Sequence, residues 1–478
     1  MSKRGELDRN DDDVDGRPPR FPRAAFFTLG CKLNQFETEQ MREQLEVAGC
    51  ETVEWGERAD IYVVNSCTVT ARADRDTRRL ARLARRLNPE AIVVVAGCVA
   101  EVYPQSLRAM PEVDLVLPNR DKARLAELLQ SRGVLRVAPR DDRPDYAGTG
   151  PMLTRFAGHT RAFVKVQEGC DAACAYCVIP QARGRARSVP SDVVEQQVRA
   201  LLAAGHPEIV LIGTHLGRYG ADLDPPTTLG QLCLRLCNIE ELPRLRLSSI
   251  EPGEVDDDIR RLVAHGGAAL AGDQAQRYGR GKVCRHLHLP LQSGSDSVLA
   301  RMGRPYEADF YAQLVRQLVQ DSPALAVGAD VLVGFPGERE EEFAETLALV
   351  EALPLAYLHV FTYSPRPGTR AAAMGDQVPP EERKRRNHAL REIGARKQVA
   401  FAKSQVGATL EVVIERRLEP DLFEGISDNY LRVKFRARHT APKPLMAVKI
   451  AAAEGDGVAG VALTEYGATD AERKTSRV

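Results

Sequence analysis

Three cysteines lie close together in the segment 170–177, at Cys170, Cys174 and Cys177. Closely spaced thiolates can hold three irons of a four-iron cluster and leave the fourth iron open to a ligand. Zinc is a competing interpretation, but a structural zinc site normally has four protein ligands, and no Cys or His follows within the next few residues. A loop of ordinary reduced thiols is the third interpretation. The spacing favours an iron–sulfur cluster and leaves the other two open.

The residues before this loop indicate how it is positioned. An alternating apolar run at 162–166 predicts a strand. Gly169 then allows the chain to turn, because glycine accepts backbone angles that other residues avoid. The cysteine loop is therefore expected at the carboxyl end of a strand, where barrel enzymes build their active sites.

Three more cysteines, Cys31, Cys67 and Cys98, each follow an apolar, strand-like run. A helical pattern comes after each of them, as at 37–45, so the segment predicts βα units with a parallel sheet. The carboxyl ends of parallel strands share one edge, and the three cysteines should converge there as a second three-thiolate site. The alternative is that cysteine is simply common at buried strand ends. The four remaining cysteines are predicted to be buried thiols: Cys50, Cys233, Cys237 and Cys284.

The C-x3-C-x2-C spacing, with Tyr176 before the last cysteine, resembles the signature of the radical S-adenosylmethionine enzymes. The resemblance implies a [4Fe-4S] cluster on Cys170, Cys174 and Cys177, whose open iron binds S-adenosylmethionine. Reductive cleavage of that cofactor gives a 5′-deoxyadenosyl radical, while the protein positions the cofactor and excludes competing reactions. It also implies a reducing electron donor such as flavodoxin or ferredoxin.

Further motifs resemble the methylthiotransferases within that group. Residues 28–35 with Glu37, residues 65–70 and residues 96–98 are similar to the amino-terminal domain that carries their second cluster. The resemblance runs over roughly residues 24–465 and implies a second [4Fe-4S] cluster on Cys31, Cys67 and Cys98.

The substrate branch rests on two short stretches. Residues 32–35 and 67–70 are most similar to the branch that methylthiolates N6-threonylcarbamoyladenosine at position 37, beside the tRNA anticodon. The resemblance therefore implies the anticodon stem-loop of tRNA as partner. The alternatives are isopentenyladenosine in tRNA, a ribosomal-protein aspartate, or a non-catalytic metal-cluster protein that binds RNA.

Several residues at or near predicted strand ends are expected to contact the cofactor or the substrate. A buried structural hydrogen bond is the alternative for each polar member of the set. The predicted contacts are Tyr176, Gly213, Glu251, Gln292, Asp330 and Gly334.

The order of patterns along the chain predicts an α/β protein. Residues 1–22 are expected to be a disordered tail, and residues 23–145 a βα domain with a parallel sheet. Residues 155–399 repeat strand and helix as in an open, partial (βα) barrel. Residues 403–465 alternate as in a small β-barrel, which resembles the RNA-binding TRAM barrel of tRNA-modifying enzymes. Residues 466–478 are a second tail, and the glycine-rich insert at 266–281 is expected to be a surface loop.

The composition sets limits on location and partners. The 478 residues include ten cysteines but no secretory signal and no apolar run of membrane-spanning length. This predicts a cytoplasmic protein with thiols and clusters rather than disulfides, and no membrane partner. The net charge of zero is a weak point for RNA binding, because phosphate contacts need Lys and Arg.

Basic side chains are nevertheless concentrated in three places. Arg183, Arg185 and Arg187 follow the cysteine loop, as phosphate contacts or as a loop anchored by salt bridges. Arg432, Lys434, Arg436 and Arg438 alternate along one predicted strand and should share one face, which favours a nucleic-acid surface. A predicted helix at 71–87 has an RNA-facing or merely solvated basic face formed by Arg72, Arg75, Arg78, Arg79, Arg82, Arg85 and Arg86.

Overall fold

A parallel sheet comes first in the chain and confirms the predicted βα units. The strand order is β2-β1-β3-β4-β5, and β3 is buried along its whole length because helices cover both faces. The strands are β1 (Arg23–Thr28), β2 (Glu51–Val53), β3 (Ile61–Ser66), β4 (Ile92–Gly97) and β5 (Leu115–Leu117). The computed structural model describes residues 21–135, 141–266, 273–274, 281–437 and 443–463.

Two hydrophobic layers hold this sheet, one on each face. Successive strand residues point to opposite faces, so Val63 and Val94 pack with α1 and α5, while Tyr62 and Val93 pack with the other helices. The covering helices are α1 (Lys32–Val47), α2 (Ala71–Leu87), α3 (Cys98–Val102), α4 (Pro104–Arg108), the 3-10 turn η1 (Asn119–Arg124) and α5 (Leu125–Gln130).

The central part of the chain is an open, partial (βα) barrel, as predicted. Its parallel strands follow the order β6-β8-β9 and β10-β11-β12, and bridges from Leu245 to Val283 and from Ser249 to His288 join the two groups. A short antiparallel strand, β7 (Arg187–Ser188), lies beside β6. The barrel strands are β6 (Arg161–Glu168), β8 (Glu208–Gly213), β9 (Arg244–Leu247), β10 (His286–His288), β11 (Ala326–Val333) and β12 (Tyr357–Thr362).

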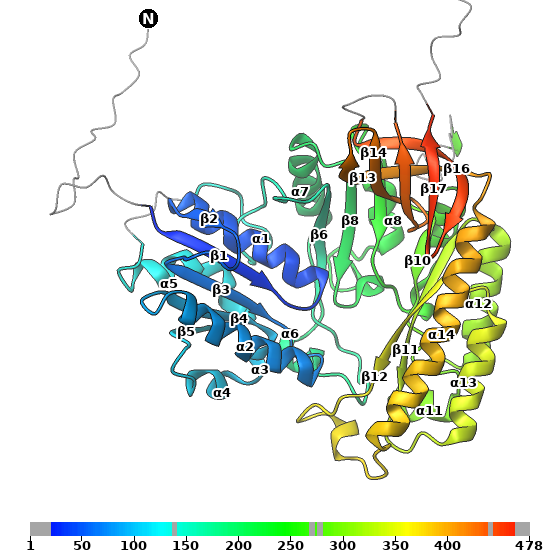
Figure 1. Ribbon diagram of the computed structural model, residues 1–478, viewed down its shortest axis with the longest axis horizontal. Helices are drawn as coiled ribbons and strands as arrows, with labels where there is room; N and C mark the ends of the chain where they lie inside the picture. The colour runs from blue at the N-terminus through cyan, green and yellow to red at the C-terminus, as the bar shows by residue number, and fades with distance from the viewer. Residues whose placement is uncertain (1–20, 136–140, 267–272, 275–280, 438–442, 464–478) are drawn as a thin grey trace, which may run out of the picture.

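Helices cover the outer side of this barrel, and the amino-terminal sheet stands beside its open side (Figure 1). The longest helix, α14, packs along the edge strand β12. The described helices are α6 (Ile179–Arg183), α7 (Ser191–Ala203), α8 (Leu229–Cys237), α9 (Asp257–Ala264), α11 (Asp296–Met302), α12 (Ala308–Asp321), α13 (Glu340–Ala352) and α14 (Pro380–Ser404).

A closed β-barrel ends the described chain, again as predicted, with strand order β13-β14-β15-β17-β16. Arg246 in β9 joins it to the central barrel, since its guanidinium pairs with buried Glu208 and donates to the Ser427 carbonyl at 2.8 Å. The small barrel thus sits at the amino ends of the central strands, opposite the cysteine loop. Its strands are β13 (Thr409–Glu419), β14 (Leu422–Ser427), β15 (Arg432–Arg436), β16 (Leu445–Glu454) and β17 (Gly457–Ala462).

The remaining predictions divide into those the structure describes and those it does not. Within the described ranges, no helix combines the length and apolar character that crossing a membrane requires. The four cysteines predicted as buried thiols are all buried: Cys50, Cys233, Cys237 and Cys284. Both predicted tails, most of the insert at 266–281 and Arg438 lie outside the described residues.

Candidate active site

The first cysteine group lies in the loop between β6 and α6. Cys170, Cys174 and Cys177 all line one cavity of about 790 Å³, which we call the main cavity. Gly169 makes the loop possible: its φ is +77°, and a Cβ there would lie 1.9 Å from the Arg185 carbonyl oxygen. The segment after the loop can therefore pack directly against its beginning.

Four of the predicted contacts share the wall of the main cavity with the three cysteines. Gln292 has φ +66°, in the left-handed region, and its backbone N–H donates to the Asp330 backbone carbonyl at 2.8 Å. A non-glycine residue held in this region at a cavity wall is typical of functional sites. The four residues are Tyr176, Glu251, Gln292 and Asp330.

The two predicted glycines lie elsewhere. Gly213 ends β8, where a Cβ would approach the Gln167 amide oxygen to 3.1 Å. Gly334 has φ +75°, and a Cβ there would lie 2.1 Å from Cγ of Arg383. The positive φ and the packing against Arg383 account for glycine at position 334, whereas at 213 a Cβ would need only a small shift of its neighbours. Neither glycine lines the described main cavity.

Two cations face the first cysteine group. The Cys170 sulfur lies 3.4 Å from His215 Nδ1, and Arg304 donates to the Cys174 sulfur at 3.4 Å. Burial works against ionisation of Cys170, but the hydrogen bonds from His215 and the Ala172 amide lower its pKa overall. Burial alone would lower the pKa of His215, but the Cys170 sulfur and the Glu254 carboxylate raise it to about 9. The site therefore favours thiolate at Cys170.

Cys177 differs, because burial raises the pKa of its thiol to about 12. Sequence reasoning identified neither cation. His215 lies two residues after the end of β8, a signal that could have found it. Arg304 follows α11, far along the chain, and no local pattern marks it.

The second cysteine group lies at the carboxyl edge of the amino-terminal sheet. Cys31, Cys67 and Cys98 follow the adjacent strands β1, β3 and β4. A Cβ on Gly30 would lie 2.8 Å from the Cys67 sulfur, so glycine lets the first loop approach the second cysteine. Burial raises the pKa of Cys67 to about 12, and the nearby Cys98 and Cys31 sulfurs add to the effect. The fold therefore brings these three sulfurs into one neighbourhood.

The donor chemistry of both groups fits iron–sulfur clusters. Each supplies three sulfur ligands, which suit a four-iron cluster and leave one iron without a protein thiolate. The first group faces a cavity large enough for a cofactor, because ligand sites typically enclose about 300–1,000 Å³.

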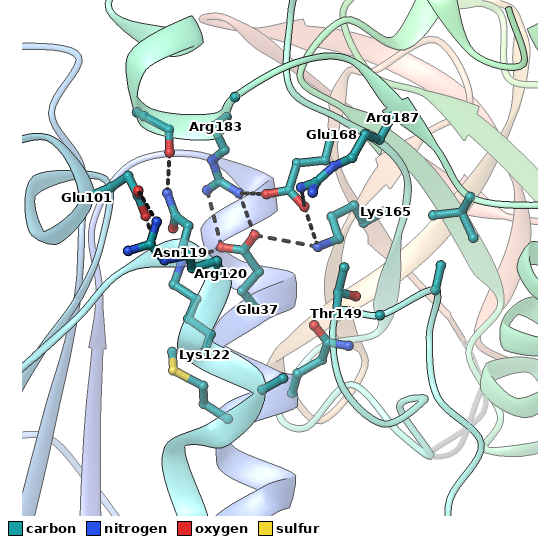
Figure 2. Close-up of a pocket in the computed structure, with 18 of the residues that line it drawn as sticks. Glu37, Glu101, Asn119, Arg120, Lys122, Thr149, Lys165, Glu168, Arg183 and Arg187 are labelled. Atoms are coloured by element: carbon teal, nitrogen blue, oxygen red, sulfur yellow. Dashed lines mark hydrogen bonds and ion pairs between the residues drawn. The ribbon is translucent and has the colours of Figure 1, made fainter. Parts of the chain in front are cut away.

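A buried cluster of charges, here called the ion network, lies between the elements that carry the two cysteine groups. Figure 2 shows its side chains Glu37, Lys122, Lys165, Glu168 and Arg183. Lys122 donates to Glu37 at 2.5 Å, and Glu37 also pairs with Arg183. Arg183 reaches Glu168 at 3.0 Å, and Lys165 reaches the same carboxylate at 3.1 Å. Its members also line a second cavity of about 440 Å³, the polar cavity.

The ion network ties together the elements that begin or end at the two cysteine groups. Glu37 lies on α1, which begins directly after Cys31, and Arg183 ends α6, which follows Cys177. Burial would raise the pKa of Glu37, but Arg183, Lys122 and Lys165 hold it well below its usual range. Arg183 is therefore anchored by salt bridges and is buried, so it is no phosphate contact.

Helix α6 separates the two cavities. Its first residue, Ile179, lines the main cavity together with Val178. The residues at its other end, Gln181 to Arg183, line the polar cavity. Asn119 lies on the polar side and donates to the Ala182 carbonyl at 2.7 Å, while its side-chain nitrogen lies 3.8 Å from the Cys98 sulfur.

A second connection runs through residues 364–371, which we call the bridging loop. Arg366 is buried, pairs with Asp74 and donates to the Thr68 hydroxyl at 2.9 Å, just after Cys67. At the other end of the loop, the Ala371 amide donates to the Ala175 carbonyl at 2.8 Å. The bridging loop therefore touches the segments that carry both cysteine groups.

The predicted basic strand is observed on one face of β15. Arg432, Lys434 and Arg436 are exposed and alternate with buried residues. Each has an acidic neighbour; for Arg436 this is Asp421, at 2.7 Å. Local pairing reduces the charge that this face offers to a phosphate backbone. On α2 the exposed arginines are Arg72, Arg75, Arg79, Arg82 and Arg86.

Comparisons with known proteins agree with this geometry. Residues 23–118 match the model of "Uncharacterized protein family UPF0004", and residues 164–350 match the radical SAM superfamily. The chain is 36% identical over 440 residues to the threonylcarbamoyladenosine tRNA methylthiotransferase MtaB of Bacillus subtilis, covering 89% of this chain and 93% of that protein. For the MtaB of Aquifex aeolicus, identity is 37% over 418 residues, with coverage of 86% and 96%.

Relatives with another named substrate match as well. The tRNA-2-methylthio-N(6)-dimethylallyladenosine synthase of Bacillus pumilus is 33% identical over 446 residues, covering 89% of this chain and 83% of that protein. Among solved structures, the radical S-adenosylmethionine methyltransferase TsrM from Kitasatospora setae aligns with a TM-score of 0.52 at 16% identity. That alignment covers 84% of this chain and 78% of the other, and supports the fold.

Proposed function

Because the chain belongs to the radical S-adenosylmethionine methylthiotransferase family, we propose that it adds a methylthio group to N6-threonylcarbamoyladenosine at position 37 of tRNA. The observation that carries the proposal is the pair of three-cysteine groups joined by the ion network and the bridging loop. One group suits radical generation, and the other suits a second cluster near by.

The proposal gives the residues of the first group defined tasks. Cys170, Cys174 and Cys177 would hold the [4Fe-4S] cluster, and S-adenosylmethionine bound there supplies the 5′-deoxyadenosyl radical. His215 and Arg304 offset the negative charge of the thiolates. The walls of the main cavity hold the target base near the cluster and keep water away.

The second group, Cys31, Cys67 and Cys98, would hold the other cluster, which would present the sulfur that is to be transferred. The reaction also needs a reducing partner, for which we propose flavodoxin or ferredoxin. The anticodon stem-loop of tRNA would bind across the mouth of the main cavity, with the enzyme in the cytoplasm. Helix α2 begins at Ala71, four residues after Cys67, and its exposed arginines would contact the stem.

Nucleoside analysis of tRNA tests the substrate. Mass spectrometry of tRNA from a strain that lacks this gene should show N6-threonylcarbamoyladenosine without its 2-methylthio derivative. The intact gene should restore the derivative, and a gene with Cys67→Ser should not. Retention of the derivative in the deletion strain would contradict the proposal. Loss of the 2-methylthio isopentenyl derivative instead would select the second candidate, which the Bacillus pumilus relative supports.

Iron content tests the cluster assignment independently of the substrate. Anaerobically reconstituted protein should hold about eight irons, because each cysteine group suits one four-iron cluster. Replacing Cys170, Cys174 and Cys177 together with Ala should leave about four. Loss of all iron, or of none, would show that the two groups are not separate sites.

A further inference from the structure

A third group of potential ligands lies in the central barrel and includes no cysteine. It consists of His288 on β10, Asp330 on β11 and His359 on β12. One ligand atom from each lies within 4.8 Å of the other two. The closest approaches are 2.8 Å from His288 Nε2 to Asp330 Oδ1, and 3.4 Å from His359 Nδ1 to the same oxygen.

The strand register produces this convergence. Asp330 and His359 are direct partners across the parallel strands β11 and β12. His288 is paired with Gly328 on β11, one inward-facing position before Asp330. Side chains two residues apart on a strand share a face, so all three enter the same interior space.

The histidine on β10 is also held by a hydrogen-bond partner on its other nitrogen. Tyr357 Oη lies 3.0 Å from His288 Nδ1 and 2.8 Å from His286 Nε2. Metal-binding histidines almost always use their second nitrogen in this way, which fixes the ring and its tautomer. Here the arrangement directs Nε2 of His288 at the Asp330 carboxylate.

We propose that His288, Asp330 and His359 form a binding site for one divalent transition-metal ion, separate from the two clusters. Two imidazoles and one carboxylate are a common donor set for Zn²⁺ and Fe²⁺. Tetrahedral bonds of about 2.1 Å place ligand atoms about 3.4 Å apart, so His288 and Asp330 need only a small separation to admit the ion.

Proton positions are consistent with such an ion. With a metal on Nε2, the His288 proton must sit on Nδ1, where it is donated to the Tyr357 oxygen. The Tyr357 hydroxyl can then donate to His286 Nε2, so each of its two short contacts joins one donor and one acceptor.

The ion would have an open position. The side chain of His359 is 52% exposed, and Asp330 also lines the main cavity beside the first cysteine group. Three protein ligands leave a fourth position for water or for an oxygen of a molecule in that cavity. The proposal does not rest on the tRNA substrate proposed above.

Cobalt is a suitable probe, because its absorption reports the ligand types. The test uses protein in which the six cysteines of both groups are replaced by Ser, with folding checked by circular dichroism. We expect one equivalent of Co²⁺ with visible d–d bands and no sulfur-to-metal charge-transfer band. Should that variant not fold, the same titration is made on reconstituted protein washed with chelator, where the ion adds one equivalent to the cluster iron.

Graded variants locate the ion. Asp330→Asn and His359→Phe should abolish the d–d bands, and Tyr357→Phe should weaken binding about tenfold, because it removes the partner of His288. His388→Phe, on the exposed side of α14, is the matched control and should bind Co²⁺ like the parent. Binding of less than one equivalent, or equal binding by Asp330→Asn, would show that the three side chains form only a hydrogen-bonded cluster.

Discussion

The two cysteine groups are built in different ways. Cys170, Cys174 and Cys177 come from one loop between consecutive elements, so the local chain sets their spacing. Cys31, Cys67 and Cys98 come from three separate strand ends, and only the folded sheet brings them together. The first site therefore depends on a short segment, and the second depends on a whole domain. Changes that loosen the contact between the amino-terminal domain and the central barrel should therefore disturb the second site before the first.

The electrostatic surroundings of the two cysteine groups also differ. His215 and Arg304 reach the sulfurs of the first group directly. At the second group the uncharged side chain of Asn119 joins Cys98 to α6, while the charges of the ion network lie behind it. At the first group, cations that contact the sulfurs directly balance the charge of the thiolates. At the second group, the nearby charges belong to the ion network between the domains.

The largest expected effect comes from Arg183→Met. Removing this buried guanidinium leaves Glu37 and Glu168 with fewer partners, which should cost about 3–5 kcal/mol of stability. Urea unfolding followed by circular dichroism measures the loss. Arg185→Met is the matched control, because that side chain is 93% exposed, and it should change stability little. Equal effects of the two changes would show that the buried ion network contributes no more to stability than an exposed ion pair.

Arg366→Leu tests the bridging loop. It should lower the free energy of unfolding by about 2–3 kcal/mol, because Asp74 keeps its charge without its partner. Iron analysis after reconstitution should show the second group losing occupancy while the first keeps its cluster. In a double-mutant cycle, Asp74→Asn should add little to Arg366→Leu, because both remove the same ion pair. Full additivity, or equal iron loss from both groups, would break the distinction drawn between them.

A change far from both groups sharpens the comparison. Reversing Arg432, Lys434 and Arg436 to Glu should weaken tRNA binding and flatten its salt dependence, by about 0.9 in logarithmic slope for each phosphate that the variant no longer neutralises. Neither cysteine group takes ligands from the small barrel, so iron content should stay constant. Thermal melting checks the fold. Unchanged affinity and slope in a folded variant would exclude this face and leave the arginines of α2 as the RNA-binding surface.

The smallest effect concerns the thiol chemistry of the first group. In metal-free, reduced protein, Cys170 should react with iodoacetamide faster than Cys177, because His215 favours its thiolate while burial suppresses that of Cys177. His215→Asn should slow the reaction of Cys170 at pH 7 by roughly three- to tenfold.

The pH dependence of that effect has a definite sign. The pKa of His215 is raised to about 9, so the imidazolium is present at neutral pH and is lost as the pH rises through that value. The difference between parent and variant should therefore shrink above pH 9. Peptide mass spectrometry follows each cysteine separately, and a constant difference up to pH 10 would contradict the assigned interaction.

Much of the fold followed from local patterns, because strand and helix periodicity and residues such as Gly169 act over short distances. The partners of the first cysteine group did not, since Arg304 and Cys174 lie in distant segments. Arg183 illustrates a second limit: the sequence shows a basic residue, and only the packing of α1 and β6 against it shows that it is buried. Gly334 owes its place to Arg383 on α14, a neighbour that no strand pattern indicates.

The short helix α6 is a partition shared by two compartments. One end faces the space that we assign to the radical chemistry, and the other faces the buried charges between the domains. A residue inserted or deleted between Ile179 and Arg183 would rotate one end of the helix by about 100° relative to the other, so α6 could no longer present both walls. Natural variants of this chain should therefore tolerate length changes in surface loops, while the number of residues between Cys177 and Arg183 stays fixed.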